Sequence, residues 1–361
     1  MNHNTDLFKS DPFLFSEKNK QLFINALREN ASTHYENCSF FKFLWDKRGF
    51  TPDDIKTELD LVKMPFILVN LFKEQELMTG SKEDIVLTLG SSGTSGQRSL
   101  IHLDQDSLDN VKLLAFNIHQ KLGMTTDEKC NYLCFTYDPK VANDLGTAFT
   151  DELLTSFTGV NEVYYSFQFD GKEFHYDEAA TLNKLTEFSK STYPTRILGF
   201  PSFLYDLVTK YDLKLNLGAD SWVQTGGGWK DQKDREIPKG EFRELVANSL
   251  GLPIENIRDL FGMVEHGIPY VDDKFGRLRI PNYARVFIRD PKTLEVKNNG
   301  EKGLIQFICS YNTSYPSMSL LTTDYGRKFE DQEGEYLEIL GRAGVSKNKG
   351  CALKALELFN E

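Results

Sequence analysis

The sequence predicts an α/β fold, with one large domain of parallel strands flanked by helices and a small β-rich subdomain after it. Between residues 85 and 269, short apolar strands alternate with amphipathic helices, a rhythm typical of parallel sheets. From residue 270 to 340 the pattern is one of alternating strands separated by turns such as Asn298-Asn299-Gly300. The chain has 361 residues, 40% hydrophobic and 26% charged, which suits a globular protein with a large core.

Charge and cysteine content argue against several kinds of partner. A net charge of −11 and a pI near 5.2 disfavour nucleic acid or an anionic membrane as the main partner. The chain has no run of 18 apolar residues and begins with polar ones, so we expect neither a membrane span nor a signal peptide. Five scattered cysteines predict free thiols in a reducing cytoplasm. Cys130 and Cys134 lack a second Cys/His pair nearby, so we expect core packing there rather than metal binding.

Residues 1–84 are predicted to form a helical lead-in that packs on the main sheet. Between residues 16 and 48, apolar side chains recur at the spacing of one buried helix face. Thr51-Pro52-Asp53 is typical of a helix start. No pattern in this region indicates chemistry.

The α/β core, predicted over residues 85–269, begins with a strand that runs into a glycine-rich loop. The apolar residues 86–89 end at Gly90, and six small residues follow: Ser91, Ser92, Gly93, Thr94, Ser95 and Gly96. Glycine lets the backbone approach a ligand closely, and hydroxyl and N–H groups can converge on phosphate oxygens. Arg98 adds a fixed positive charge suited to the same oxygens. A flexible surface loop is the alternative, but direct continuation from an apolar strand favours phosphate binding.

The loop spacing differs from two common nucleotide loops. A Walker loop requires a lysine directly after its last glycine, and Gly96 is not followed by lysine. The glycines are spaced G-x-x-G-x-x-G, which differs from the G-x-G-x-x-G pattern of dinucleotide-binding loops. Further elements then alternate in order, namely helix 107–122, strand 132–135, strand 163–165, helix 177–191, strand 196–199 and helix 202–211. Gly226, Gly227 and Gly228 follow the next strand. One glycine would suffice for a strand-to-helix turn, so three in a row favour contact with a flat ligand ring.

Two carboxylates stand out in the last third of the chain. Glu265 follows an apolar run and the tight Gly262, which predicts a carboxylate at a strand end, and a helix-start role is its alternative. Asp324 precedes Gly326 in the β-rich part, where a turn aspartate is the ordinary interpretation. His266 is expected to be an ordinary polar neighbour rather than a base.

The order of these segments resembles the motifs of acyl-adenylate-forming enzymes. Residues 91–99 resemble their Ser/Thr/Gly signature loop, with Ser99 at the position of its lysine. Residues 261–265 resemble their YGxTE segment, with Val264 in place of threonine, and residues 322–324 resemble TGD, with Thr323 in place of glycine. Residues 341–350 resemble the hinge GRxxDxxKxxG, and only eleven residues follow, so the family's mobile C-terminal domain is expected to be cut to a short tail.

The resemblance implies a site for ATP and Mg²⁺. It implies that the 91–96 loop binds phosphates, that Arg98 substitutes for the missing lysine, and that Glu265 binds the Mg²⁺ that bridges the phosphates. It also implies that residues 226–228 border the adenine and that Asp324 chelates the ribose hydroxyls. Arg342, in the hinge, is then expected to be catalytic.

The predicted tail, residues 341–361, is a hinge remnant and a short helix rich in Ala, Leu, Lys and Glu. Gly350 puts Cys351 in the first turn of that helix, where the helix dipole and three lysines, Lys347, Lys349 and Lys354, would lower the thiol pKa. This makes Cys351 a candidate nucleophile, with a spectator cysteine as the alternative.

With this tail, the chain resembles the acyl-protein synthetases of bacterial fatty-acid reductase complexes. The resemblance implies that a carboxylic (fatty) acid attacks the α-phosphate of ATP. The acyl group then moves from the adenylate to Cys351, and from there to a partner acyl reductase. Two alternatives are a ligase resembling phenylacetate–coenzyme A ligases and a non-catalytic nucleotide-binding subunit.

Overall fold

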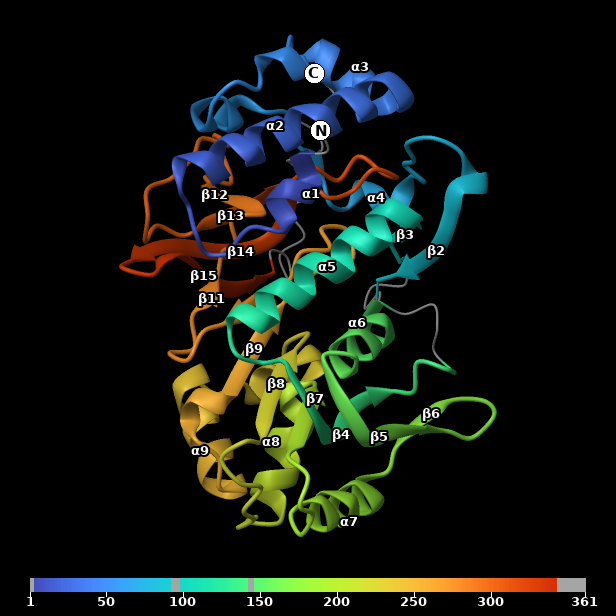
Figure 1. The fold of residues 1–361 in the computed structure, drawn as a ribbon, viewed down its shortest axis with the longest axis vertical. Helices are drawn as coiled ribbons and strands as arrows, with labels where there is room; N and C mark the ends of the chain where they lie inside the picture. The colour runs from blue at the N-terminus through green and yellow to red at the C-terminus, as the bar shows by residue number, and fades with distance from the viewer. Residues whose placement is uncertain (1–2, 92–97, 142–145, 343–361) are drawn as a thin grey trace.

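The computed structural model describes residues 3–91, 98–141 and 146–342 (Figure 1). Within these residues, thirteen strands form one sheet with the order β12-β13-β14-β15-β11-β10-β9-β8-β7-β4-β5-β6, and β1 pairs with β14. A separate hairpin pairs β2 with β3. The first eight strands are β1 (Ile67–Leu68), β2 (Ile85–Gly90), β3 (Leu100–Asp104), β4 (Thr126–Tyr137), β5 (Thr158–Phe169), β6 (Phe174–Tyr176), β7 (Thr195–Gly199) and β8 (Trp222–Gly226). The others are β9 (Ile257–Phe261), β10 (Tyr270–Asp272), β11 (Leu278–Arg279), β12 (Ala284–Arg289), β13 (Gly303–Cys309), β14 (Ser319–Asp331) and β15 (Gly334–Arg342).

The sheet has a parallel half and an antiparallel half. Strands β5, β4, β7, β8 and β9 pair in parallel, as the alternation of strands and helices predicts. Beyond β9 every pairing along the path is antiparallel, so the strands after residue 270 continue the same sheet through β10. The predicted mixed α/β class is therefore confirmed.

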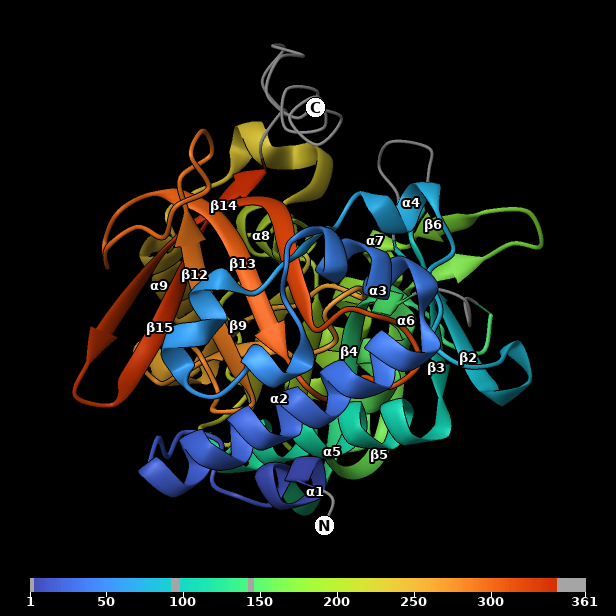
Figure 2. The same ribbon diagram turned by 90° about the horizontal axis from the view of Figure 1, so that it is seen from above.

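Helices lie at both ends of the long axis of the molecule (Figure 1). The helices are α1 (His3–Phe8), α2 (Glu17–Asn37), α3 (Ser39–Lys47), α4 (Leu71–Glu74), α5 (Gln105–Lys121), α6 (Gly146–Thr155), α7 (Glu178–Phe188), α8 (Pro201–Lys210) and α9 (Lys239–Leu250). Short 3₁₀ turns are η1 (Pro52–Asp54), η2 (Glu58–Lys63), η3 (Lys82–Asp84), η4 (Lys230–Arg235) and η5 (Ile254–Asn256). Helices α1–α3 lie at one end and α7–α9 at the other, with α5 between them (Figure 1), and α2 and α3 lie in front when the molecule is seen from above (Figure 2).

Local sequence accounts for where several helices begin and end. Asp104 caps α5, since its Oδ1 accepts the Ser107 N–H at 2.8 Å, and Asp177 caps α7 in the same way. Pro201 occupies the first turn of α8, where its missing N–H costs no hydrogen bond. Gly251 ends α9 in the left-handed region, at φ +64°.

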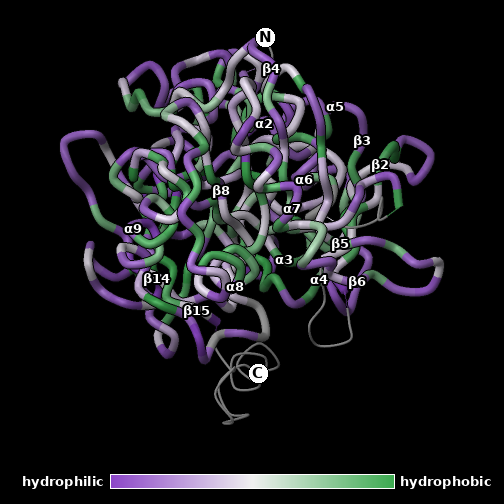
Figure 3. Tube along the Cα trace, turned by 90° about the horizontal axis from the view of Figure 1, so that it is seen from below, coloured by the Kyte–Doolittle hydropathy of each residue, from purple (hydrophilic) through white to green (hydrophobic). Residues whose placement is uncertain are grey.

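The parallel strands separate two hydrophobic cores. Alternate residues of the strands, including Leu133, Ile197 and Val223, pack with α7, α8 and α9 in one core. Their neighbours face the larger core, which also holds the lead-in helices and α5. Hydrophilic loops project at the periphery (Figure 3). Within the described ranges, no helix is long and apolar enough to cross a bilayer.

Candidate active site

The glycine-rich loop leaves the β2–β3 hairpin through a closed neck. Ser91 N–H donates to Ser99 O at 3.0 Å, and Ser99 N–H donates to Ser91 Oγ at 3.0 Å. Arg98, beside the neck, is exposed. Ser92, Gly93, Thr94, Ser95 and Gly96 lie outside the described residues.

Gly146, the first residue of α6, brings this neck close to the segment that carries Glu265. A Cβ built on Gly146 would lie 2.2 Å from Val264 Cγ1 and 3.5 Å from Gly90 O. Only glycine leaves room for this approach, so the end of β2, the start of α6 and Val264 converge. No local pattern distinguishes Gly146 in the sequence, and sequence analysis missed it.

Glu265 lies in a tight turn directly after β9. His266 N–H and Gly267 N–H both donate to Met263 O, at 3.1 and 2.9 Å, which closes the turn. The Glu265 side chain is nearly buried, with the residue 6% exposed. Its carboxylate makes no hydrogen bond or ion pair with any residue that the structure describes. A buried carboxylate is stable when a cation accompanies it, so this position suits a metal ion.

Aromatic side chains pack against the Glu265 turn and contact its backbone. The Tyr315 hydroxyl lies 3.2 Å from Val264 O and 3.3 Å from Glu265 O, and 3.2 Å from the Tyr311 hydroxyl. The His266 ring stacks on Phe307 with centroids 4.6 Å apart. Because Phe307 belongs to β13, far along the sheet order, the antiparallel half curls round onto this turn.

His266 is not available as a proton acceptor at neutral pH. Complete burial lowers its pKa to about 3, so the ring stays neutral. Its Nε2 is 2.9 Å from the Tyr270 hydroxyl, and the Cys309 thiol lies 3.6 Å from Nδ1. Its role in the described structure is therefore packing and hydrogen bonding within the core.

A buried polar network continues from Tyr315 to the lead-in helices. We call it the Asn312 network, and its members are Asn30, His34, Ser107, Asn312, Ser314 and Tyr315. Asn312 Oδ1 accepts from the backbone N–H of Ser314 and Tyr315, at 2.9 and 3.2 Å, and from the Ser107 hydroxyl at 3.2 Å. The Asn312 carbonyl accepts from Asn30 Nδ2 at 2.6 Å and lies 3.0 Å from His34 Nε2. The network thus ties α2, α5 and the Glu265 turn to one loop.

The second glycine cluster ends β8, beside β9. Gly226 pairs with Leu260, and a Cβ on Gly226 would lie 3.2 Å from Leu260 O. Gly227 and Gly228 follow at φ +74° and +68°, a conformation that favours glycine. These glycines therefore stand at the carboxyl end of the parallel strands, as β9 leads into the Glu265 turn.

Two carboxylates next to this cluster, Asp259 (partly exposed) and Asp272 (buried), lie near the same lysine, Lys239. Asp259 Oδ1 accepts from Thr225 Oγ1 at 3.2 Å, and burial raises the Asp259 pKa. Burial likewise raises the pKa of Asp272 to about 6, although Lys239 Nζ lies 2.6 Å from its Oδ1. These groups belong to α9, β9 and β10, and Asp259 contacts Thr225, the residue before Gly226 in the glycine cluster.

Asp324 and Arg342 face one another on neighbouring strands. They are register partners in β14 and β15, and Arg342 Nε lies 3.3 Å from Asp324 Oδ1. Asp324 is mostly buried, whereas the Arg342 side chain is 59% exposed. In the strand order, β15, β11 and β10 separate β14 from β9. Cys351 lies outside the described residues.

The described residues hold no cluster of three or more His, Cys, Asp or Glu side chains suited to a metal ion. A cation at Glu265 would therefore take further ligands from phosphate and water, which is usual for Mg²⁺. The site residues that the structure brings together are Ser91, Gly146, Val264 and Glu265, with Tyr315 behind them. Tyr315 was also missed in the sequence, where only the polar run after the apolar strand 304–309 hints at a structured loop.

Comparison with known proteins identifies related chains over nearly the whole length. A sequence model of the family described as acyl-protein synthetase, LuxE, matches residues 2–359. The long-chain-fatty-acid–luciferin-component ligase of Vibrio harveyi is 27% identical over 362 residues, 98% of this chain and 92% of that protein. The protein of the same name from Aliivibrio fischeri is 27% identical over 368 residues, 98% of this chain and 93% of that protein.

Solved structures show the same fold at low sequence identity. An open conformation of 2-hydroxyisobutyryl-CoA ligase, in complex with 2-HIB-AMP and CoA, superposes with a TM-score of 0.70 at 13% identity, over 93% of this chain and 77% of that one. The same ligase in its postadenylation state superposes with a TM-score of 0.67 at 14% identity, over 92% and 69%. At this identity the likeness establishes the fold alone.

Proposed function

The chain belongs to the acyl-protein synthetase family, and from this we propose that it activates a long-chain fatty acid with ATP and passes the acyl group through its own cysteine to a partner reductase. Family membership confirms the resemblance drawn from the sequence. Together with the named ligases at 27% identity, it makes the protein an AMP-forming ligase. The fatty-acid substrate follows the names of those relatives, and the remaining steps are argued from residues.

The nearly buried Glu265 carboxylate is the single observation that carries the proposal. It has no protein partner among the described residues, yet it lies in the turn next to the start of α6 and the neck of the glycine-rich loop. A loop that binds phosphates would bring their negative charge to this point, and Glu265 would hold the accompanying Mg²⁺. When bound, that ion neutralises phosphate charge during attack on the α-phosphorus.

In the first step, a carboxylate oxygen of the fatty acid attacks the α-phosphorus of ATP. The new P–O bond replaces the bond to the β-phosphate oxygen, and pyrophosphate leaves. Residues 91–96 and Arg98 would hold the phosphates, residues 226–228 would border the adenine, and Asp324 would bind the ribose hydroxyls. Arg342, paired with Asp324, would then stand beside the nucleotide. No protein base is needed, because positioning and charge stabilisation supply the catalysis.

In the second step, the Cys351 thiolate attacks the acyl carbonyl carbon. A C–S bond forms, the C–O bond to phosphate breaks, and AMP leaves, while the thiol proton passes to solvent. The thioester then supplies the acyl group to a partner acyl reductase. Lys347, Lys349 and Lys354 favour the thiolate form in this scheme.

The test is intact-mass measurement after incubation with ATP, Mg²⁺ and a panel of fatty acids. We expect the wild-type mass to rise by one acyl group and the adduct to be lost in Cys351→Ser. Cys38→Ala is the matched control, because it removes a buried thiol elsewhere and should keep the adduct. An adduct that persists in Cys351→Ser contradicts the cysteine assignment.

Fatty-acid-dependent exchange of pyrophosphate into ATP tests the first step separately. Glu265→Gln should lower exchange by at least about a hundredfold, since loss of one charge-stabilising group in such a site costs about 3 kcal/mol. Glu244→Gln, on the exposed face of α9, should leave it unchanged. Exchange without a protein adduct, with release of acyl-CoA on adding coenzyme A, would instead indicate the CoA-ligase alternative. No exchange at all would indicate a nucleotide-binding subunit.

A further inference from the structure

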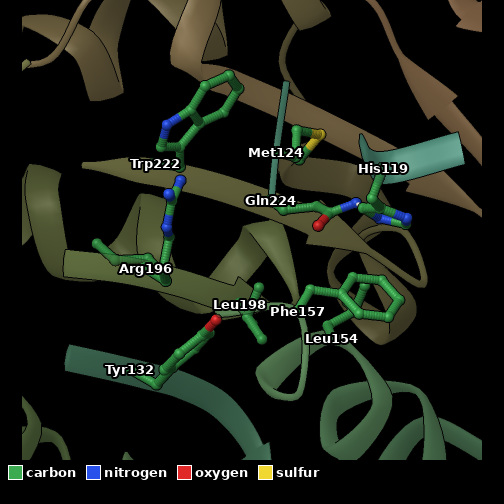
Figure 4. Close-up of a pocket in the computed structure, with 10 residues that line it drawn as sticks. His119, Met124, Tyr132, Leu154, Phe157, Arg196, Leu198, Trp222 and Gln224 are labelled. Carbon is green, nitrogen blue, oxygen red and sulfur yellow. The ribbon is translucent and has the colours of Figure 1, made fainter. Parts of the chain in front are cut away.

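A small cavity lies on one face of the parallel half of the sheet. Tyr132, Arg196 and Trp222 are register partners on β4, β7 and β8, so their side chains form a row on one face of the sheet (Figure 4). Gln224 and His119 complete the polar part of the lining. Trp222 starts β8 and Gly226 ends it, so the Arg196–Trp222 side of the cavity is about 13 Å along the strand from the glycine cluster.

Arg196 brings an uncompensated charge into this cavity. The residue is 8% exposed, and its Nε and Nη1 atoms are buried without a hydrogen-bond partner among the described residues. The same part of the chain provides no carboxylate within ion-pair distance of it. Its guanidinium instead lies 5.4 Å from the centre of the Trp222 ring. A buried cation without a partner is strongly unfavourable, so an anion in the cavity would relieve the cost.

The other polar groups of the cavity are neutral. Burial lowers the pKa of His119 to about 4, while its Nδ1 lies 2.7 Å from Ala115 O and its Nε2 lies 3.0 Å from Gln224 Nε2. Burial raises the pKa of Tyr132 to about 12. The lining therefore holds one positive charge and no negative charge at neutral pH.

A second guanidinium strengthens the positive potential at this end of the sheet. Arg258, on β9, lies 5.0 Å from the centre of the Trp222 ring. Its Nη1 donates to Asp272 O at 2.7 Å and its Nε donates to Glu255 O, so carbonyl dipoles satisfy it. Arg196 has no such carbonyl partners at Nε and Nη1. The two arginines flank one indole, and among the described residues Nε and Nη1 of Arg196 are buried donors without a hydrogen-bond partner.

We propose that this cavity binds one small monatomic anion of the chloride class, held next to Trp222 by one of the two unpartnered donors of Arg196, Nε or Nη1. The cavity volume is about 20 Å³, enough for about one water-sized species. A monatomic anion matches this volume better than phosphate, sulfate or a carboxylate-bearing ligand does. The site does not depend on adenylation, because it lies at the other end of the strands from the Glu265 turn.

The test compares thermal unfolding of the full chain in sodium chloride, sodium bromide and sodium gluconate at constant ionic strength. The unfolding temperature is expected to rise with chloride or bromide concentration and to stay flat in gluconate. Arg196→Met should abolish the difference between the salts, and Arg28→Met, which removes an arginine from the α2 surface, should keep it. An equal response to chloride in wild type and Arg196→Met overturns the proposal.

Crystals of the wild-type protein grown in bromide provide a test that needs no variant to fold. Anomalous scattering from bromide within hydrogen-bond distance of Arg196 Nε or Nη1 supports the site. A cavity filled by water only, in crystals that show bromide elsewhere, overturns it. Loss of this site would leave the adenylation proposal untouched, since pyrophosphate exchange reports on the Glu265 end of the strands.

Discussion

Two buried polar clusters in this molecule differ in how their hydrogen bonds are completed. At Asn312, the side chain and the carbonyl together contact groups from α2, from α5 and from their own loop. At Arg196, two buried donors have no partner among the described residues. Both clusters contain a buried neutral histidine, His34 in the first and His119 in the second.

The presence or absence of hydrogen-bond partners within the chain distinguishes two kinds of buried polar cluster. The first holds chain segments in place, and we call it a brace; the second is a cavity that favours a ligand. Where partners come from the chain itself, a buried polar cluster fixes the relative position of distant segments, and the Asn312 network fixes the backbone that carries Glu265. Where partners are missing, the unmet hydrogen-bonding capacity favours a ligand from outside the chain. Substitutions in the first cluster should therefore act on stability and on the site together, and those in the second on stability and salt response.

The largest expected effect is loss of stability in acid, shared by both clusters. Burial lowers the folded-state pKa of His34 and of His119 to about 4, below the ordinary value of 6.5. Both rings are therefore neutral in the folded protein, and their stabilisation is complete above pH 6.5. As pH falls from 6.5 to 4, each histidine becomes protonated in the unfolded chain before it does so in the folded protein. The free energy of unfolding therefore decreases by up to about 3 kcal/mol for each histidine.

Urea unfolding at pH 7.5, 6.0 and 5.0 measures this effect. His34→Gln and His119→Gln should each reduce the decrease in the free energy of unfolding between pH 7.5 and 5.0 by the contribution of one histidine. Both variants should also be less stable than the wild type at pH 7.5. His175, which is exposed on β6, provides the control, and His175→Gln should leave the profile unchanged. Profiles as steep in His34→Gln and His119→Gln as in the wild type would contradict the assigned burial of the two rings.

Asn312→Ala should produce the next largest effect. The substitution leaves the N–H groups of Ser314 and Tyr315 without their acceptor in a buried loop, and it removes an acceptor of the Ser107 hydroxyl. We expect a loss of about 3 kcal/mol in the free energy of unfolding, since each unsatisfied buried group costs about 1–3 kcal/mol. Asn298→Ala, in an exposed turn, should cost less than about 1 kcal/mol. An equal loss of unfolding free energy in Asn312→Ala and Asn298→Ala would contradict the role of Asn312 in holding the buried loop in place.

Features that depend on residues close together in the sequence could be predicted, and contacts between residues far apart in the sequence could not. The α/β class could be predicted because strand and helix periodicity is local, and the family could be recognised because its motifs are short. The Ser107–Asn312 contact joins residues 205 positions apart, and nothing in either segment predicts the other. Arg196 comes near the start of an ordinary apolar strand pattern, where the sequence alone suggests a solvent-exposed arginine at a strand end. Its burial depends on the register with Tyr132 and Trp222 on the neighbouring strands.

Tyr315→Phe should give the smallest effect, but one that links the brace to the site. Loss of the hydroxyl removes its contacts with Val264 O and Glu265 O, worth about 1 kcal/mol of stability. Tyr283→Phe is the matched control, because that buried hydroxyl also donates to two carbonyls, Phe8 O and Ser10 O, far from Glu265 in the sequence. Both variants should unfold at similarly lower urea concentrations. Only Tyr315→Phe should raise the Mg²⁺ concentration for half-maximal pyrophosphate exchange, by about fivefold if 1 kcal/mol of positioning is lost. An unchanged Mg²⁺ requirement would show that the brace stabilises the fold without positioning Glu265.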